Sequence, residues 1–306
     1  MFRRLLVPLD GSQLAETVLP VVQAFAGRFD ADVTLLHVVE RRPPADVHGE
    51  RHLASLAEAE AYLRDVAARH FASGRATVHV HGPGEGDVAP LIARHAEEFG
   101  SGLVMLCSHG RGGARDLLVG SVAQQVLAVG SAPVLLVKPP TGPTPASKVF
   151  ACSRVLVPLD GSRPSEAALG PAATVARAFG AEVYLLSVVP TVATVPTDRA
   201  PAALMLPGAT ALSLEMDEEA VTGYLDDLAA RLRADGTTAR AFVGRGDPAV
   251  IVTEMAGRLE ADLLVLATHG RSGMTALWAG SVATRIAARC QRPMLLVRAP
   301  GVPQTP

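Results

Sequence analysis

Leu5-Leu6-Val7-Pro8-Leu9-Asp10-Gly11-Ser12 returns 150 residues later as Val155-Leu156-Val157-Pro158-Leu159-Asp160-Gly161-Ser162. A second segment, Ser108-His109-Gly110-Arg111-Gly112-Gly113, returns 160 residues later as Thr268-His269-Gly270-Arg271-Ser272-Gly273. Gly-Ser-Val-Ala follows each of these, at 120–123 and at 280–283. The chain therefore contains one module twice, and a feature found in both copies is a candidate for the shared function of the module.

Each copy alternates short apolar runs with longer segments of helical spacing. In the first copy the predicted strands are Arg4–Leu9, Asp32–Val39, Thr77–His81, Leu103–Cys107 and Pro133–Lys138. The predicted helices between them are Gln13–Arg28, about Glu50–Ala72, Asp87–Phe99 and Ser121–Val129. The second copy repeats this order, with strands at Val155–Leu159, Glu182–Val189, Thr238–Val243, Leu263–Ala267 and Pro293–Arg298.

This alternation predicts an α/β, Rossmann-like fold, because strands joined through helices form right-handed crossovers and a parallel sheet. We expect two doubly wound domains, each with a five-stranded parallel sheet in the order 3-2-1-4-5 and helices on both faces. The predicted boundaries are a first domain over 1–140, a proline-rich linker over 141–151 and a second domain over 152–300. The second copy also carries an insertion within Pro190–Glu215, which we expect to be a surface loop, with a lid or a partner-binding patch as the alternative.

Composition excludes several functional classes. A net charge of −2 and an aromatic content of 4% leave no basic, aromatic-rich surface, so no nucleic-acid partner is expected. The sequence contains no long uncharged apolar stretch, so no membrane span is expected. Three widely spaced cysteines and a strand-like start directly after Met1 favour reduced thiols, no signal peptide and a cytoplasmic location.

Both repeated motifs follow predicted strands at their carboxyl ends. Asp10 and Asp160 follow strand one, and the pairs His109-Gly110 and His269-Gly270 follow strand four. In the order 3-2-1-4-5, strands one and four are neighbours at the switch point where open α/β sheets bind ligands. We therefore expect the two motifs to border one crevice in each domain.

The second motif has the chemistry of an anion site. Nine residues lie between Gly110 and Gly120-Ser121, and nine also lie between Gly270 and Gly280-Ser281. A glycine-containing loop lets backbone N–H groups approach an anion, and the helix that follows presents free N–H groups and a positive dipole end. The alternative is a turn and helix cap, and for Asp10 and Asp160 the alternative to binding a ribose hydroxyl is likewise a helix cap.

Together these segments, with Leu35-Leu36-His37-Val38-Val39 and Gly-Asp-Val/Pro-Ala at 86–89 and 246–249, resemble the universal stress protein family over nearly all of both halves. The nucleotide-binding members of that family carry Gly-x2-Gly-x9-Gly-Ser/Thr and bind ATP at the sheet switch point. The resemblance implies that Pro8 and Asp10 flank adenosine, that Val38 offers backbone groups to adenine, and that phosphates lie against Gly110, Gly120, Ser121 and Val122. In the second copy the matching positions are Pro158, Asp160, Val188, Gly270, Gly280, Ser281 and Val282.

The remaining candidate site residues belong to the same motif: His109, Arg111, Gly113, His269, Arg271 and Gly273. Arg111 and Arg271 either reach phosphate or are solvated. The first glycine of the family motif is replaced by Cys107 and by Ala267, which are small but disfavour a positive φ.

Other patterns are assigned structural roles. Asp247-Pro248 reads as a helix N-cap followed by proline at the first helical position. The pairs His48/His52 and His79/His81 have no counterpart in the second copy, so no metal site is predicted. Cys107 is interpreted as a buried structural thiol, since Ala267 replaces it.

The resemblance implies an ATP-binding, non-enzymatic stress-response regulator with one site per domain, the ligand being ATP with or without Mg²⁺. A weak ATPase or adenylate-forming enzyme and a nucleotide-free interaction scaffold are the alternatives. No motif lysine or evident base is present, which argues against catalysis. Related single-domain proteins pair through the last strand, so the two copies are expected to form an intramolecular pseudo-dimer, with a homodimer left open and the protein client unknown.

Overall fold

The computed structural model describes residues 1–41, 46–83, 86–108, 121–139, 149–195, 201, 205–269 and 282–299. Contacts divide the chain into two compact units that correspond largely to the two sequence copies. The first unit is formed by Met1–Ala151 together with Pro293–Arg298, and most of the second comes from the residues after Ala151.

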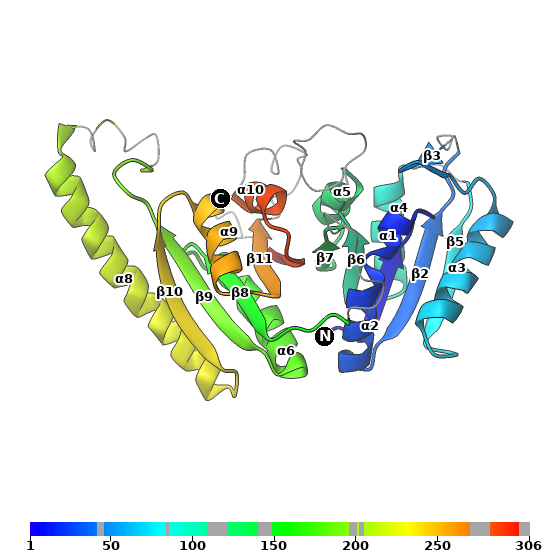
Figure 1. Ribbon diagram of the computed structural model, residues 1–306, viewed down its shortest axis with the longest axis horizontal. Helices are drawn as coiled ribbons and strands as arrows, with labels where there is room; N and C mark the ends of the chain where they lie inside the picture. Colours follow the sequence, from blue (N-terminus) through cyan, green and yellow to red (C-terminus); the bar gives the residue numbers. More distant parts are fainter. Residues whose placement is uncertain are drawn as a thin grey trace, which may run out of the picture. The chain divides into compact units, whose positions relative to one another are not determined.

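Five parallel strands form the sheet of the first unit (Figure 1). They are β1 (Arg4–Pro8), β2 (Asp32–Val38), β5 (Ala76–His81), β6 (Leu103–Cys107) and β7 (Val134–Val137). Their order is β7-β6-β1-β2-β5, which confirms the predicted 3-2-1-4-5 arrangement. This unit also includes most of β12 (Met294–Ala299), which pairs with β7 in the antiparallel sense, Met294 lying opposite Leu136.

The second unit repeats this plan. Its strands β8 (Arg154–Leu159), β9 (Glu182–Val189), β10 (Ala239–Arg245) and β11 (Leu263–His269) lie in the order β10-β9-β8-β11. All three pairings are parallel, so the 3-2-1-4 part of the predicted order is present here as well. Strands β1, β6 and β8 are buried along most of their length, as expected where helices cover both faces of a parallel sheet.

Helices alternate with these strands as the spacing predicts. In the first unit they are α1 (Gln13–Glu16), α2 (Leu19–Phe29), α3 (Leu56–His70), α4 (Val88–Glu98) and α5 (Ser121–Val129). In the second unit they are the 3₁₀ turn η1 (Ser165–Ala168), α6 (Leu169–Phe179), α8 (Pro207–Ala234), α9 (Pro248–Arg258) and α10 (Val282–Arg289). A short hairpin, β3 (Asp46–Val47) and β4 (Glu50–Arg51), precedes α3.

Two predicted helix boundaries are wrong for identifiable reasons. The single helix expected over Gln13–Arg28 is two helices, because Pro20 has no N–H to continue the ladder from α1. The helix expected from about Glu50 begins instead at Leu56. Ser55 caps it by accepting a hydrogen bond from Glu58 N, and Glu58 in turn accepts one from Ala54 N.

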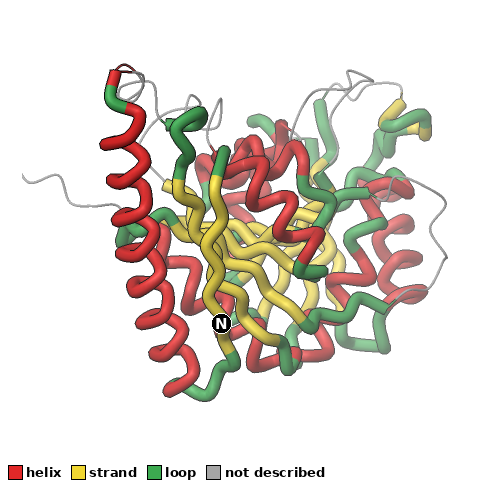
Figure 2. The backbone as a smooth tube through the Cα atoms, turned by 60° about the vertical axis from the view of Figure 1, so that its left-hand side comes forward, coloured by secondary structure: helices red, strands yellow, loops and turns green. Residues whose placement is uncertain are grey.

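The insertion of the second copy is also corrected by the structure. Pro190–Glu215 was expected to form a surface loop, but its last nine residues are the first turns of α8 (Figure 2). Pro207 lies in the first turn of the helix, where the missing N–H of proline costs no intrahelical hydrogen bond. The Ala, Leu and Met residues that follow it are strong helix formers. The 28 residues of α8 span about 42 Å, roughly twice the length of the seven-residue strand β10 beside it.

Candidate functional site

The first and fourth strands are parallel neighbours in both units, so their carboxyl ends lie at the same edge of the sheet, as the central sequence inference requires. Leu5 of β1 lies opposite Leu103 of β6, and Val155 of β8 lies opposite Leu263 of β11. In the first unit a side-chain contact links the end of β6 to the residue that ends α1: Thr17 Oγ1 lies 3.2 Å from Cys107 Sγ. The segment after Asp10 and the end of β6 therefore meet at one edge of the sheet.

The side chain of Asp10 stabilises a tight turn at this edge of the sheet. Its Oδ1 accepts hydrogen bonds from Ser12 N at 2.9 Å and from Ser12 Oγ at 2.7 Å. Ser12 Oγ accepts from Ala15 N, so the N-cap of α1 is Ser12 and not the aspartate. Both bonds of the turn end on the same carboxylate oxygen, Oδ1.

The second unit builds the same turn from the same residue types. Asp160 Oδ1 accepts from Ser162 N at 3.0 Å and from Ser162 Oγ at 2.6 Å. Ser162 Oγ accepts in turn from Ser165 N. Gly11 and Gly161, between the two partners of each turn, have φ of +94° and +79°, which only glycine adopts without strain.

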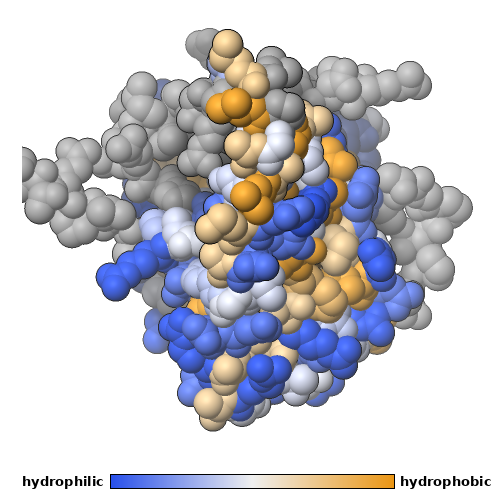
Figure 3. Space-filling model, turned by 90° about the vertical axis from the view of Figure 1, so that its left-hand side faces the viewer, coloured by the Kyte–Doolittle hydropathy of each residue, from blue (hydrophilic) through white to orange (hydrophobic). Residues whose placement is uncertain are grey.

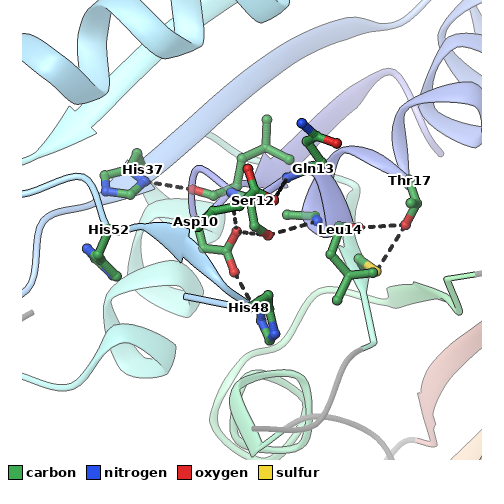
Figure 4. A network of polar contacts seen from close by, with 12 residues as sticks. Asp10, Ser12, Gln13, Leu14, Thr17, His37, His48 and His52 are labelled. Atoms are coloured by element: carbon green, nitrogen blue, oxygen red, sulfur yellow. Dashed lines mark hydrogen bonds and ion pairs between the residues drawn. The ribbon is translucent and has the colours of Figure 1, made fainter. Parts of the chain in front are cut away.

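A hairpin in the first unit lies against this turn (Figure 4). His48 Nε2 is 3.7 Å from Asp10 Oδ2, and Glu50 Oε1 accepts a hydrogen bond from Gln13 N at 2.9 Å. His48 and Gly49 connect β3 to β4 with positive φ values, as in the two-residue turns of tight hairpins. Sequence reasoning missed this contact, although Gly49 is a residue that such turns favour.

His37, near the end of β2, is a second feature of this edge of the sheet, and Ser187 occupies the matching position in the second copy. His37 is 2% exposed and donates from Nδ1 to Leu9 O at 2.7 Å. Burial lowers the pKa of His37 and outweighs the hydrogen bond to Leu9, which favours the protonated ring. The neutral ring keeps Nε2 as a buried acceptor without a hydrogen-bond partner among the described residues.

His48 and His52 do not converge on a common point in the way metal ligands do. His48 faces Asp10, whereas His52 Nε2 lies 3.7 Å from Glu40. Within the described ranges no group of three or more His, Cys, Asp or Glu side chains is arranged to hold a metal ion.

None of the described helices is long and apolar enough to cross a membrane.

The other described candidates lie where their strands end. Pro8 pairs with Leu36 across β1 and β2, and Pro158 pairs with Leu186 across β8 and β9. Further residues at these edges are Val38 and Val188 near the ends of β2 and β9, Cys107 and Ala267 in β6 and β11, and Val122 and Val282 at the starts of α5 and α10. Cys107 is buried and its thiol is not in a disulfide, consistent with a structural thiol.

The glycine-rich part of the predicted site lies outside the described residues. This applies to His109, Gly110, Arg111, Gly113, Gly120, Gly270, Arg271, Gly273, Gly280 and Ser281, and to the side chains of Ser121 and His269. Helix α5 does begin at Ser121, as the Gly-Ser motif predicts.

The sequence model of the universal stress protein family matches residues 1–138 and again residues 152–298. The chain belongs to the universal stress protein family. A universal stress protein of Methanocaldococcus jannaschii, MJ0531, is 30% identical over 148 residues, which cover 48% of this chain and 82% of that relative. The crystal structure of a universal stress protein from Archaeoglobus fulgidus superimposes with a TM-score of 0.69 at 19% identity, covering 97% of this chain and 96% of that one. A further match, with a TM-score of 0.35, 24% identity and coverage of 49% of this chain and 99% of that one, is a universal stress protein in complex with cAMP.

Proposed function

We propose that each unit binds one adenine nucleotide, ATP, at the carboxyl edge of its sheet, and that the protein is a regulator that does not turn the nucleotide over. The observation that carries this proposal is the aspartate–serine turn, built identically in both units beside the fourth strand. Two copies that differ elsewhere keep the same carboxylate in the same geometry at the switch point of the sheet.

The parts of this edge suit the parts of a nucleotide. Asp10 and Asp160 present carboxylates that accept hydrogen bonds from ribose hydroxyl groups. Val38 and Val188 lie at the adjoining strand ends, where the family resemblance expects adenine. Helix α5 begins at Ser121, and the N–H groups of a first helical turn attract phosphate.

Catalysis is not part of the proposal, because phosphoryl transfer needs charge neutralisation and an oriented nucleophile. The chain has only two lysines, Lys138 and Lys148, and neither belongs to the repeated motifs. We expect phosphate release from ATP to stay at the background rate. An ATPase activity that is lost in Gly120→Val/Gly280→Val would instead support the enzyme alternative.

Calorimetry of the full chain, freed of bound nucleotide, tests the proposal. We expect the wild-type chain to bind two ATP molecules and each of the variants Asp10→Asn and Asp160→Asn to bind one. Asparagine keeps the hydrogen-bond acceptor of the turn but removes the charge. Asp87→Asn, an aspartate without a side-chain cap hydrogen bond at the start of α4, is the matched control and keeps both sites.

Thermal unfolding gives an independent readout. ATP at a hundred times its dissociation constant stabilises the native state by about 2.7 kcal/mol per site, and the double variant Asp10→Asn/Asp160→Asn loses most of that increase. If the wild-type protein carries no nucleotide on purification and neither ATP nor AMP changes its unfolding midpoint, the scaffold alternative replaces this proposal. The pseudo-dimer and a further homodimer stay predictions.

A further inference from the structure

Helix α8 extends beyond the sheet that it covers. Glu218 forms an ion pair with Arg245, the last residue of β10, so the part of α8 before Glu218 continues past the end of that strand. No described residue between 208 and 224 is buried, and the first buried side chain of the helix is Leu225. The first half of α8 therefore adds little to the core of its own unit.

Large apolar side chains are concentrated on this extension and immediately before it. Met205, Leu206, Leu212 and Met216 are exposed by 83%, 63%, 60% and 64%, and we call these four residues the α8 patch. Leu212 and Met216 are one helical turn apart and point the same way, opposite the face that carries Leu225. Figure 3, which faces the α8 side of the molecule, shows hydrophobic side chains gathered there beside strongly hydrophilic ones.

The first copy supplies an internal control. Helix α3 occupies the corresponding place against β2 and β5, yet its only large exposed apolar side chain among the described residues is Leu56. The acids of α3 are paired with arginines, as in Glu60–Arg64 and Asp65–Arg69. The module therefore does not require an exposed apolar helix at this position.

The charge that α8 itself carries beside the α8 patch has one sign. Between Pro207 and Ala230 the helix contains six acidic residues and no lysine or arginine. Glu215 and Glu219 are exposed and follow Leu212 and Met216 by three residues, so they border the patch along one flank. A surface with apolar side chains and an acidic border attracts an apolar segment that carries positive charge.

This charge pattern selects among occupants. A second copy packed on the patch would bring the acidic borders of two α8 helices together, and an anionic lipid surface would meet the same repulsion. Methionine side chains are flexible and adapt to different apolar partners. We propose that the α8 patch docks a cationic amphipathic helix of a partner protein, with apolar residues at i, i+3/i+4 spacing and Lys or Arg beside them.

A defined probe tests this on the full chain. A fluorescein-labelled helical peptide of 20 or so residues carries Leu at the core positions and Lys at the flanking positions, and a control peptide carries Glu in place of each Lys. Fluorescence anisotropy is expected to show saturable binding of the Lys peptide and at least tenfold weaker binding of the Glu peptide.

Variants locate the site. Leu212→Gln/Met216→Gln is expected to weaken the Lys peptide at least tenfold, and Glu215→Gln/Glu219→Gln is expected to weaken it severalfold and to flatten its salt dependence. Leu56→Gln on α3 is the matched control and keeps wild-type affinity. All of these positions are exposed, and far-UV circular dichroism with the unfolding midpoint checks that each variant is folded.

Three results would overturn the proposal: no saturable binding of the Lys peptide, equal binding of the Lys and Glu peptides, or undiminished binding to Leu212→Gln/Met216→Gln. Sedimentation that shows a dimer of the chain, dissociated by Leu212→Gln/Met216→Gln, would assign the patch to a second copy instead. The outcome does not depend on nucleotide, so it stands apart from the proposed function.

Discussion

Gly11 and Gly161 occupy the same position of the same turn, but their surroundings differ. A Cβ atom on Gly11 would lie 2.8 Å from Leu53, whereas nothing lies within 4 Å of the corresponding point on Gly161. Gly161→Ala should therefore cost only the conformational penalty of a positive φ, about 1–2 kcal/mol.

Gly11→Ala should cost about 1–3 kcal/mol more than Gly161→Ala, because Leu53 must also move. Urea unfolding of the two variants beside wild type measures the difference in the free energy of unfolding. Equal losses in both variants would show that Leu53 does not rest on this turn in solution.

At the residue scale, sequence motifs located the strand-end positions of the site but not all of their contacts. The repeat correctly placed Asp10 and Asp160 just after their strands, and the capping residue of α1 is Ser12 instead of the aspartate. The approach of His48 to Asp10 could not be predicted, because it depends on where a separate hairpin packs. Local patterns reveal a turn, whereas long-range side-chain contacts depend on the tertiary structure.

Helix starts differ between the copies even where the sequence pattern is shared. Asp247 caps α9, its Oδ1 accepting from Ala249 N at 3.0 Å and Val250 N at 3.1 Å, as the Asp-Pro pair predicted. Its Oδ2 also pairs with Arg285 at 2.8 Å. Asp87 holds the same place before α4 but makes no side-chain cap hydrogen bond.

Asp247→Ala should therefore destabilise the protein by about 1–2 kcal/mol, and Asp87→Ala by less than about 0.5 kcal/mol. Chemical denaturation of both variants tests the contrast. Similar losses would mean that the side chain of Asp247 contributes no more than that of Asp87.

Strand β5 and helix α4 bring histidines together. His81 Nδ1 lies 3.0 Å from His95 Nε2, and His95 Nδ1 lies 2.8 Å from Glu98 Oε2. Burial lowers the pKa of both histidines, helped for His81 by Arg94 and for both by His79, against the opposing effect of Glu98. The folded protein therefore favours neutral rings.

This sets the sign of a pH effect. Below the ordinary histidine pKa of about 6.5 the unfolded chain binds more protons than the folded one, so stability is complete above that pH and falls as the pH drops below it. The thermal midpoint should decrease from pH 7 to pH 5, and His81→Gln should decrease less steeply. A variant whose midpoint follows wild type across this range would remove these histidines as the cause.

At the element scale, hydrophobic spacing predicted strands such as β1, β6 and β8 well because they are buried along most of their length. The errors fall where local chemistry overrides spacing, as at Pro20, or where a segment has few contacts to the core. The first turns of α8 are such a segment: their composition lacks charge and contains Pro and Gly, which suggested a loop, although Pro207 only begins the helix.

For the whole molecule, the internal repeat was the strongest predictor. Two matched sets of strands implied two sheets of the same order, and the strand orders β7-β6-β1-β2-β5 and β10-β9-β8-β11 agree with that expectation. The spacing of apolar residues does not determine which unit a strand joins. Strand β12 belongs to the second copy in sequence, yet most of it is part of the first unit.

The position of β12 late in the sequence determines how long the edge of β7 stays unpaired during synthesis. After Val137, at the end of β7, the ribosome adds 157 residues (294 − 137) up to and including Met294, the first residue of β12. At typical rates of chain elongation this takes roughly 8–30 s, far longer than most small domains need to fold. Throughout that interval the outer edge of β7 presents unpaired backbone groups to the cell, so the nascent chain is most open to unwanted strand pairing while its second half is being made.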